Sequence, residues 1–445
     1  MSGDTIFALS TPPGRSGVAV IRVSGPAAWE GYSLLTPGQI LPTARQAVTR
    51  KLFDPNSGEI LDHAMVIGFR GPSSFTGEDS VEYQIHGGTA IIDGVLKVLS
   101  SLPYHRMALP GEFTRRAFEN GKIDLTAAEA IADLIHAETE SQRLQALKQM
   151  DGALFYLYEG WKDRLARILA LMEADLDFSD QDLPDDLILK VTPDVTDIMG
   201  EIDCHLNDGH RGELLRDGLR LVILGAPNAG KSSLLNKLCQ RDAAIVSPIA
   251  GTTRDVIDVH LNLGGYSVIL ADTAGLRETD NHIEAEGITR AINRAGQADL
   301  KILLFDGTKE LDQQTMDLVD DRSIIVLNKS DEKGFHAPIE GPNILKMSVL
   351  RDEGIEELID SIIAALKAMI EAANSSSHFP LLTRARHREA LEKAYLSLAR
   401  SVSAPLPELA AEDIRMAVRH LGSLTGRVDV EDLLDMIFRD FCIGK

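Results

Sequence analysis

One short segment of the chain, residues 225–232, has the residue types of a phosphate-binding loop. It reads Gly-Ala-Pro-Asn-Ala-Gly-Lys-Ser and fits the pattern G-x-x-x-x-G-K-S, between the apolar run 219–224 and the helical run 233–238. Glycines let backbone N–H groups approach phosphate oxygens, and a helix N-terminus favours negative charge. The segment therefore predicts a nucleotide site in which Lys231 contacts the β- and γ-phosphates and Ser232 ligates magnesium.

A second motif, Asn328-Lys329-Ser330-Asp331, follows the apolar run 324–327 and fits N-K-x-D. An aspartate carboxylate accepts hydrogen bonds from guanine N1–H and N2–H, which adenine cannot supply. Ser348-Val349 stands where a guanine-contacting loop usually has Ser-Ala. Valine is compatible with that role because a backbone N–H contacts the base there. The two segments favour GTP over ATP.

Two further segments have the residue types of nucleotide-sensing switches. Asp272-Thr273-Ala274-Gly275 fits D-x-x-G, in which the aspartate meets magnesium and the glycine N–H meets the γ-phosphate. Gly251-Thr252-Thr253-Arg254-Asp255 stands where the first switch belongs. A threonine hydroxyl there can complete the magnesium shell, and spacing alone leaves both threonines open.

The glutamine that orients the attacking water in many GTPases is missing from its usual position after the D-x-x-G motif. Leu276 occupies the place of the usual glutamine and has no polar atom. The nearby polar candidates are Arg277, Glu278, Glu284 and Glu286. Asn228 is a second clue, since its amide oxygen could hold a monovalent cation that neutralises developing charge. It could equally be a turn-forming residue after Pro227.

The elements that must position these residues alternate along the chain. Apolar runs at 219–224, 268–271, 301–305 and 324–327 are typical of buried parallel strands and alternate with helical runs. The N-terminal part has strand-like runs at 17–23, 64–69 and 81–85 and a helical run at 89–99. Sequence patterns typical of helices occur at residues 125–150, 161–174, 383–402 and 407–441. We predict a multidomain α/β plus α protein with an inserted, doubly wound, mostly parallel P-loop domain.

Domain boundaries follow from these changes of texture. We predict an N-terminal α/β domain at 1–120, helical segments at 121–215 and 374–445, and a nucleotide domain at 216–373 inserted between them. A polar link at 374–377 marks the last boundary. The final helical segment is too short to bury a good core alone, so we expect it to pack against the earlier helices.

Bulk composition limits the classes of function. The net charge of -22 disfavours nonspecific binding to nucleic acid, although it allows a local basic patch. Three cysteines, Cys204, Cys239 and Cys442, lie far apart and fit a reducing compartment. The N-terminus lacks the features of a signal peptide, and no apolar run approaches the ~20 residues that span a bilayer. We expect a cytoplasmic protein that does not enter the membrane.

Several segments together resemble one family, the tRNA modification GTPases called MnmE or TrmE. The segments are residues 11–17 (Thr-Pro-Pro-Gly-Arg-Ser-Gly), 74–79 (Ser-Phe-Thr-Gly-Glu-Asp), 110–114 (Pro-Gly-Glu-Phe-Thr), 129–135 (Glu-Ala-Ile-Ala-Asp-Leu-Ile) and 441–445 (Phe-Cys-Ile-Gly-Lys). The resemblance covers essentially the whole chain. It implies an N-terminal domain that binds a formylated tetrahydrofolate and forms a homodimer, and a flavoprotein partner, MnmG (GidA). Together such proteins modify the 5-position of wobble uridine in tRNA.

The resemblance also assigns residues. It implies folate contacts by Arg22, Glu82, Lys122 and Lys445, potassium ligation by Asn228 with Ser247, Ile249 and Thr252, magnesium ligation by Ser232 and Thr253, and Glu284 as the residue that positions water. The implied GTP-binding set is Asn228, Ala229, Gly230, Lys231, Ser232, Ser233, Ser247, Pro248, Ile249, Ala250, Gly251, Thr252, Thr253, Asp272, Thr273, Ala274, Gly275, Asn328, Lys329, Asp331, Ser348 and Val349.

Two features admit both a functional and a structural interpretation. Cys442, near the chain end, is a nucleophile toward uridine, a neighbour of the folate site, or a small apolar residue that packs the tail. A cluster at Arg384, Arg386, His387 and Arg388, which Arg415 and Arg419 could extend, either faces tRNA phosphates or forms a solvated helix face. The alternative for the whole chain is a regulatory GTPase that binds RNA or the ribosome without modification chemistry. The folate-like N-terminal segments favour the modifying enzyme.

Overall fold

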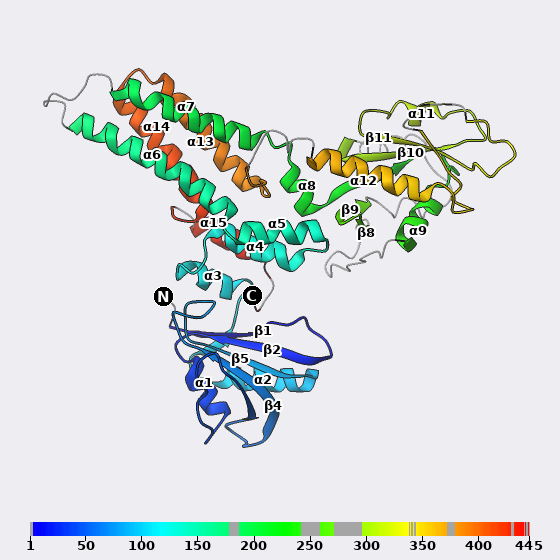
Figure 1. Ribbon diagram of the computed structural model, residues 1–445. Helices are drawn as coiled ribbons and strands as arrows, with labels where there is room; N and C mark the ends of the chain where they lie inside the picture. The colour runs from blue at the N-terminus through cyan, green and yellow to red at the C-terminus, as the bar shows by residue number, and fades with distance from the viewer. Residues whose placement is uncertain are drawn as a thin grey trace. The chain divides into compact units, whose positions relative to one another are not determined.

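The structure of the protein is a computed structural model that describes residues 3–177, 187–241, 259–270, 296–337, 339, 341, 344–371, 379–428, 431–439, 441 and 444 (Figure 1). The chain divides into two compact units, each built from separate stretches of sequence. The first comprises Met1–Ala132, Met150–Lys162 and Leu421–Lys445, and the second Asp133–Gln149 and Asp163–His420.

The first unit is organised around a six-stranded sheet in the order β3-β4-β5-β2-β1-β6. Its strands are β1 (Thr5–Leu9), β2 (Ser16–Ser24), β3 (Ala47–Phe53), β4 (Ile60–Phe69), β5 (Ser80–Gly87) and β6 (His105–Met107). All neighbours are antiparallel except β1 and β6. Strands β2, β4 and β5 and the helix that follows β5 fall where the sequence predicts them.

Successive side chains along these strands point to opposite faces of the sheet, and each face packs against different helices. Phe7, Ile21, Val23, Tyr83 and Ile85 point to one face, where they form a core with helices α1 (Ala28–Leu35) and α2 (Thr89–Ser101). The opposite face carries Ile6 and Ala8 packed on Phe113 of helix α3 (Glu112–Glu119). The start of helix α4 (Leu125–His136) packs with helix α15 (Glu431–Arg439) through Leu125, Ala128, Leu434, Phe438 and Phe441.

The second unit contains a six-stranded sheet in the order β12-β11-β10-β7-β9-β8. Its strands are β7 (Leu219–Leu224), β8 (Val259–Leu263), β9 (Tyr266–Leu270), β10 (Leu300–Asp306), β11 (Ser323–Asn328) and β12 (Ile344–Lys346). Only the β8–β9 pair is antiparallel. Ile302 and Leu304 of β10 point into one core and Leu303 and Phe305 into another, so the sheet is buried on both faces. This confirms the predicted fold class.

The part of the chain that the structure describes contains nine further helices. They are α5 (Glu140–Met150), α6 (Ala153–Asp177), α7 (Leu187–Leu206), α8 (Arg211–Asp217), α9 (Lys231–Arg241), α11 (Gln313–Met316), α12 (Ile355–Glu371), α13 (Ala385–Ser403) and α14 (Pro407–Thr425). Helices α13 and α7 lie side by side, as Figure 1 shows, and the tail end of the chain therefore packs on earlier helices as expected. None of the helices described combines the length and hydropathy of a membrane span. The three domain boundaries proposed from sequence remain predictions, and residues 374–377 lie outside the described part.

Candidate functional site

The phosphate-binding segment occupies the turn between β7 and α9. Gly230 has φ 107° and Asn228 φ 64°, backbone conformations that favour glycine and, among the other residues, asparagine. A side-chain Cβ at Gly225 would lie 2.2 Å from the carbonyl oxygen of Leu304 on β10. One at Gly230 would lie 2.3 Å from Nδ2 of Asn328. Both glycines are therefore needed for the loop to approach its neighbours this closely.

Lys231 lies at the first position of α9 with its ammonium group folded back over the loop. Nζ donates to the carbonyl oxygens of Gly225 at 2.8 Å and Ala226 at 2.9 Å. Burial lowers the pKa of this ammonium group, and the charge of Asp312 partly opposes that effect. Ser232 follows in the same first turn. A cation and a hydroxyl thus stand together at a helix N-terminus, the arrangement that phosphate and magnesium require.

Asn328 connects the phosphate-binding loop to the two guanine-motif segments. It ends β11, and its Nδ2 donates to the carbonyl oxygen of Ala229 at 2.8 Å. Its Oδ1 accepts from the backbone N–H of Val349 at 3.2 Å. One side chain therefore holds segments that are about a hundred residues apart in the sequence. This explains why an asparagine belongs here, since the role needs both a donor and an acceptor.

The other two motif side chains are held by ion pairing and hydrogen bonding. Lys329 donates to Asp306 at 2.7 Å. Burial of Asp306 would raise its pKa, but hydrogen bonds from Lys329 and Thr308 outweigh that effect and lower the pKa to about 2. Asp331 accepts from the Ser348 hydroxyl at 2.6 Å, which lowers the pKa of its carboxyl group. Asp331 is thus an ionised acceptor fixed in direction, as guanine recognition requires.

These segments surround one cavity of about 600 Å³. Its lining includes the predicted residues Asn228, Gly230, Ser233, Asn328, Lys329, Asp331 and Val349. It also includes Asn236, Lys237, Gln240, Glu332 and Leu350, which the motifs did not indicate. The helical spacing of Ser233, Asn236, Lys237 and Gln240 was the available signal, because those positions share one face of α9.

Several predicted residues lie outside the described residues and stay predictions. They are Ser247, Pro248, Ile249, Ala250, Gly251, Thr252, Thr253, Asp272, Thr273, Ala274, Gly275 and Glu284 near the nucleotide, with Arg277, Glu278 and Glu286, and Cys442 and Lys445 at the chain end.

Two of the predicted folate residues, Arg22 and Glu82, lie on the α3 face of the first sheet. Arg22 on β2 and Glu82 on β5 are direct cross-strand partners, and Nε of Arg22 donates to Oε1 of Glu82 at 2.9 Å. Lys122 is exposed, and a Cβ at Gly77 would lie 3.3 Å from its Cγ. Near the chain end, the carbonyl oxygen of Gly444 accepts from the Ser10 hydroxyl at 3.0 Å. Residues from distant parts of the sequence are thus in contact within this unit.

The basic cluster on α13 is mostly engaged within the second unit. Arg384 contacts Asp133 at 2.7 Å, and His387 is fully buried. Arg388 contacts Asp208 at 2.7 Å and Glu213 at 3.2 Å rather than Glu392. These three side chains therefore do not form a freely solvated helix face, whereas Arg419 is exposed. The reason is tertiary, since acidic partners from α4, α8 and the loop before α8 reach the start of α13. That the cluster faces tRNA phosphates stays a prediction.

Comparison with known proteins covers the whole chain. Residues 125–442 match the family model of the MnmE helical domain, and residues 5–122 match that of the GTP-binding protein TrmE N-terminus. A tRNA modification GTPase MnmE from Parvibaculum lavamentivorans is 52% identical over 99% of this chain and 100% of the relative. One of the same name from Rhodospirillum rubrum is 50% identical over 100% of both. The 5-taurinomethyluridine-[tRNA] synthase subunit GTPB3, mitochondrial, of Homo sapiens is 45% identical over 100% of this chain and 94% of the relative.

Proposed function

This chain belongs to the MnmE family of tRNA modification GTPases, and we propose that it is a potassium-activated GTP hydrolase that modifies the 5-position of wobble uridine in tRNA with a flavoprotein partner. The modification is an addition of the carboxymethylaminomethyl type that uses a one-carbon unit from folate. The reaction takes place in the cytoplasm, on a homodimer formed through the N-terminal domain.

The observation that carries the GTPase part is the position of Asn328. Its two hydrogen bonds bring the phosphate-binding loop and the loop of Ser348 and Val349 to the same cavity. Asp331 then offers its carboxylate to the base while Lys231 remains beside the phosphate loop. A site of this kind binds guanine at one end and phosphates at the other.

Bound metal ions would supply positive charge that stabilises the negative charge developing on the phosphates during hydrolysis. Ser232 and Thr253 would hold magnesium, and the Ser232 hydroxyl is a hard oxygen ligand in the first turn of α9. Asn228, which lines the cavity, would hold potassium through its amide oxygen with Ser247, Ile249 and Thr252. Glu284 would orient the water molecule, and Lys231 stabilises the phosphates.

The proposed partners rest on the family and on the N-terminal unit. The human relative is named as a synthase subunit, which supports action with a second protein, the flavoprotein MnmG. Arg22, Glu82, Lys122 and Lys445 would bind 5-formyltetrahydrofolate, and the direct pairing of Arg22 with Glu82 on one sheet face supports that role for these two residues. Cys442 is a candidate nucleophile toward uridine.

The modification function is tested by mass spectrometry of tRNA nucleosides from cells with and without this gene. We expect deletion to remove 5-substituted wobble uridines and a plasmid copy to restore them. An unchanged nucleoside profile would contradict the modification function and leave a regulatory GTPase.

The hydrolytic mechanism is tested with purified protein in potassium and in sodium salts. We expect faster GTP turnover in potassium, and we expect Glu284→Ala to lower turnover by roughly a hundredfold or more without loss of nucleotide affinity. Equal rates in the two salts would reduce Asn228 to a turn residue, and unchanged turnover would remove Glu284 from the mechanism.

A further inference from the structure

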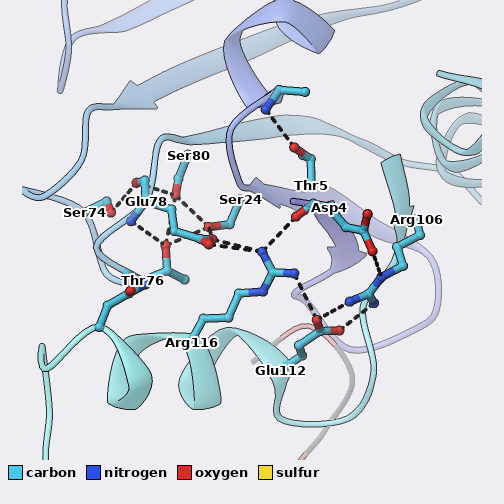
Figure 2. Close-up of polar contacts among 12 residues, drawn as sticks. Asp4, Thr5, Ser24, Ser74, Thr76, Glu78, Ser80, Arg106, Glu112 and Arg116 are labelled. Atoms are coloured by element: carbon cyan, nitrogen blue, oxygen red, sulfur yellow. Dashed lines mark hydrogen bonds and ion pairs between the residues drawn. The ribbon is translucent and has the colours of Figure 1, made fainter. Parts of the chain in front are cut away.

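A polar network anchors the loop between β4 and β5 (Figure 2). Ser24 on β2 contacts the Thr76 hydroxyl at 2.7 Å and donates to Glu78 at 2.8 Å. Asn120 donates to the carbonyl oxygen of Thr76 at 2.7 Å, and Thr76 is almost fully buried. Hydrogen bonds from three directions therefore fix this loop against the sheet.

A buried arginine extends the anchor to α3. Arg116, whose side chain is 5% exposed, contacts Glu78 at 3.2 Å and Glu112 at 3.1 Å and donates to the carbonyl oxygen of Asp4 at 3.0 Å. Figure 2 shows its guanidinium pointing between the two carboxylates. A charge this deeply buried is stable only with such partners, so the loop and helix are held in one arrangement.

Phe75 is the large apolar residue of this anchored loop, and 40% of it is exposed. The guanidinium carbon of Arg22 lies 5.5 Å from the centroid of the Phe75 ring and 5.8 Å from that of Phe113. Arg22 in turn pairs with Glu82 through one carboxylate oxygen. An exposed aromatic ring, a guanidinium and a carboxylate thus stand together on a preformed surface.

We propose that Phe75 is an unassigned ligand contact that stacks on the pterin ring of the folate. The inference rests on the proposed folate function and assigns a residue beyond Arg22, Glu82, Lys122 and Lys445. A pterin is a flat aromatic system with N–H donors along one edge. Glu82 accepts from that edge, while the ring of Phe75 covers the face.

The orientation of the rest of the ligand follows from Lys122. Gly77, two residues after Phe75, has φ 78° and lies against the stem of Lys122. The loop therefore contacts Arg22 through Phe75 and the stem of Lys122 through Gly77, and the Lys122 cation suits the glutamate tail of the ligand. Because the anchored loop needs no ordering on binding, little conformational entropy opposes the contact.

The test is isothermal titration calorimetry of the full chain with 5-formyltetrahydrofolate. We expect Phe75→Leu to weaken binding by about tenfold, the size of one aromatic stacking contact with its buried area. Phe75→Tyr keeps the ring and should retain wild-type affinity. Tyr156→Leu removes another exposed aromatic residue of the same unit and serves as the control, with affinity unchanged.

A second probe, p-aminobenzoylglutamate, carries the tail without the pterin. If Phe75 contacts the pterin, Phe75→Leu leaves the affinity for this probe unchanged. Equal losses for both probes, or a shift from dimer to monomer in the variant, would overturn the inference. If Glu82→Gln weakens folate binding and Phe75→Leu does not, Phe75 lies outside the site while the folate function stands. Absence of folate binding by the wild-type protein would remove the folate function itself.

Discussion

Asp331 shows how a single carboxylate is prepared for base recognition. Its Oδ1 accepts from Ser348, whose hydroxyl oxygen also accepts from the backbone N–H of Arg351. This chain of hydrogen bonds orients the carboxylate before the base arrives. The residue contributes charge and direction, whereas its neighbours in the motif contribute loop structure.

Replacing Asp331 by Asn should therefore change the preferred base from guanine to xanthine. An amide offers a donor to the C2 carbonyl of xanthine and loses one acceptor for guanine, so GDP affinity should fall by roughly a hundredfold while XDP affinity rises. Fluorescent-nucleotide titration measures both affinities. Asp321→Asn, an exposed carboxylate in the same unit, is the control. Retained GDP preference in Asp331→Asn would show that another group reads the base.

The Asp306–Lys329 pair makes stability depend on pH in the acid range. The pKa of Asp306 falls from 3.8 to about 2 on folding, so its contribution is present above pH 3.8 and is lost as pH falls toward 2. The shift corresponds to about 2 kcal/mol. Lys329→Met should lower the free energy of unfolding at neutral pH and flatten its decline between these pH values. Urea unfolding across this range tests this, and an unchanged acid slope would contradict it.

At the scale of elements, α3 is attached to the sheet by charge as well as by Phe113. Glu112, in the first turn of α3, forms ion pairs with Arg106 at 2.6 Å and with Arg116 at 3.1 Å. Burial opposes the charged form of Glu112, but the hydrogen bonds from Arg106 and from the backbone N–H of Leu109 outweigh it and lower its pKa. A helix of this length gains little stability from propensity alone, so these contacts determine its position.

Removing the buried cation should loosen this helix strongly. Arg116→Met leaves Glu78 without its arginine, while Glu112 keeps Arg106, so we expect a cost near the lower end of about 3–5 kcal/mol. Hydrogen exchange of the α3 amides measures the local effect. Arg115→Met is the matched control, because the pairs of Arg115 with Glu119 and Asp435 are exposed and contribute about 1 kcal/mol or less. Equal exchange in the two variants would contradict the anchoring role.

At the scale of the whole molecule, each compact unit is assembled from distant stretches of sequence. In the first unit, a Cβ at Gly111 would lie 2.7 Å from the carbonyl oxygen of Phe438, so the start of α3 touches the backbone of α15. Phe438 and Phe441 are buried against Leu125 of α4. The last residues of the chain therefore complete a core that the first third begins.

Truncating Phe438 should destabilise residues far from it in sequence. Phe438→Ala removes a buried ring and should cost about 3–5 kcal/mol. We expect faster hydrogen exchange of the α3 amides and of the α4 amides up to Ala132. Leu350→Ala, at an exposed position, should leave exchange there unchanged. Protection of both helices in Phe438→Ala would show that the α15 contact is dispensable.

Local chemistry was sufficient to predict much of this protein. The apolar runs of β7, β10 and β11, buried on both faces, predict parallel strands, and the segments at their ends predict the nucleotide loops. Patterns failed where local signals are weak, as in β3, whose Ala-Val-Thr-Arg-Lys-Leu-Phe run does not alternate cleanly, and in β6, which has only three residues. Such strands are defined by their pairing partners and not by their own residues.

Only the tertiary structure decided which side chains meet. The family resemblance indicated Arg22 and Glu82, but their direct pairing depends on the register of β2 and β5. The bridging role of Asn328 and the neutralisation of Arg388 by Asp208 likewise depend on chain segments far apart in sequence. Periodicity and motif spacing report neighbours along the chain, whereas charge pairing and ring contacts depend on neighbours in space. Burial of the two cores brings those spatial neighbours together, and no local pattern encodes their distances.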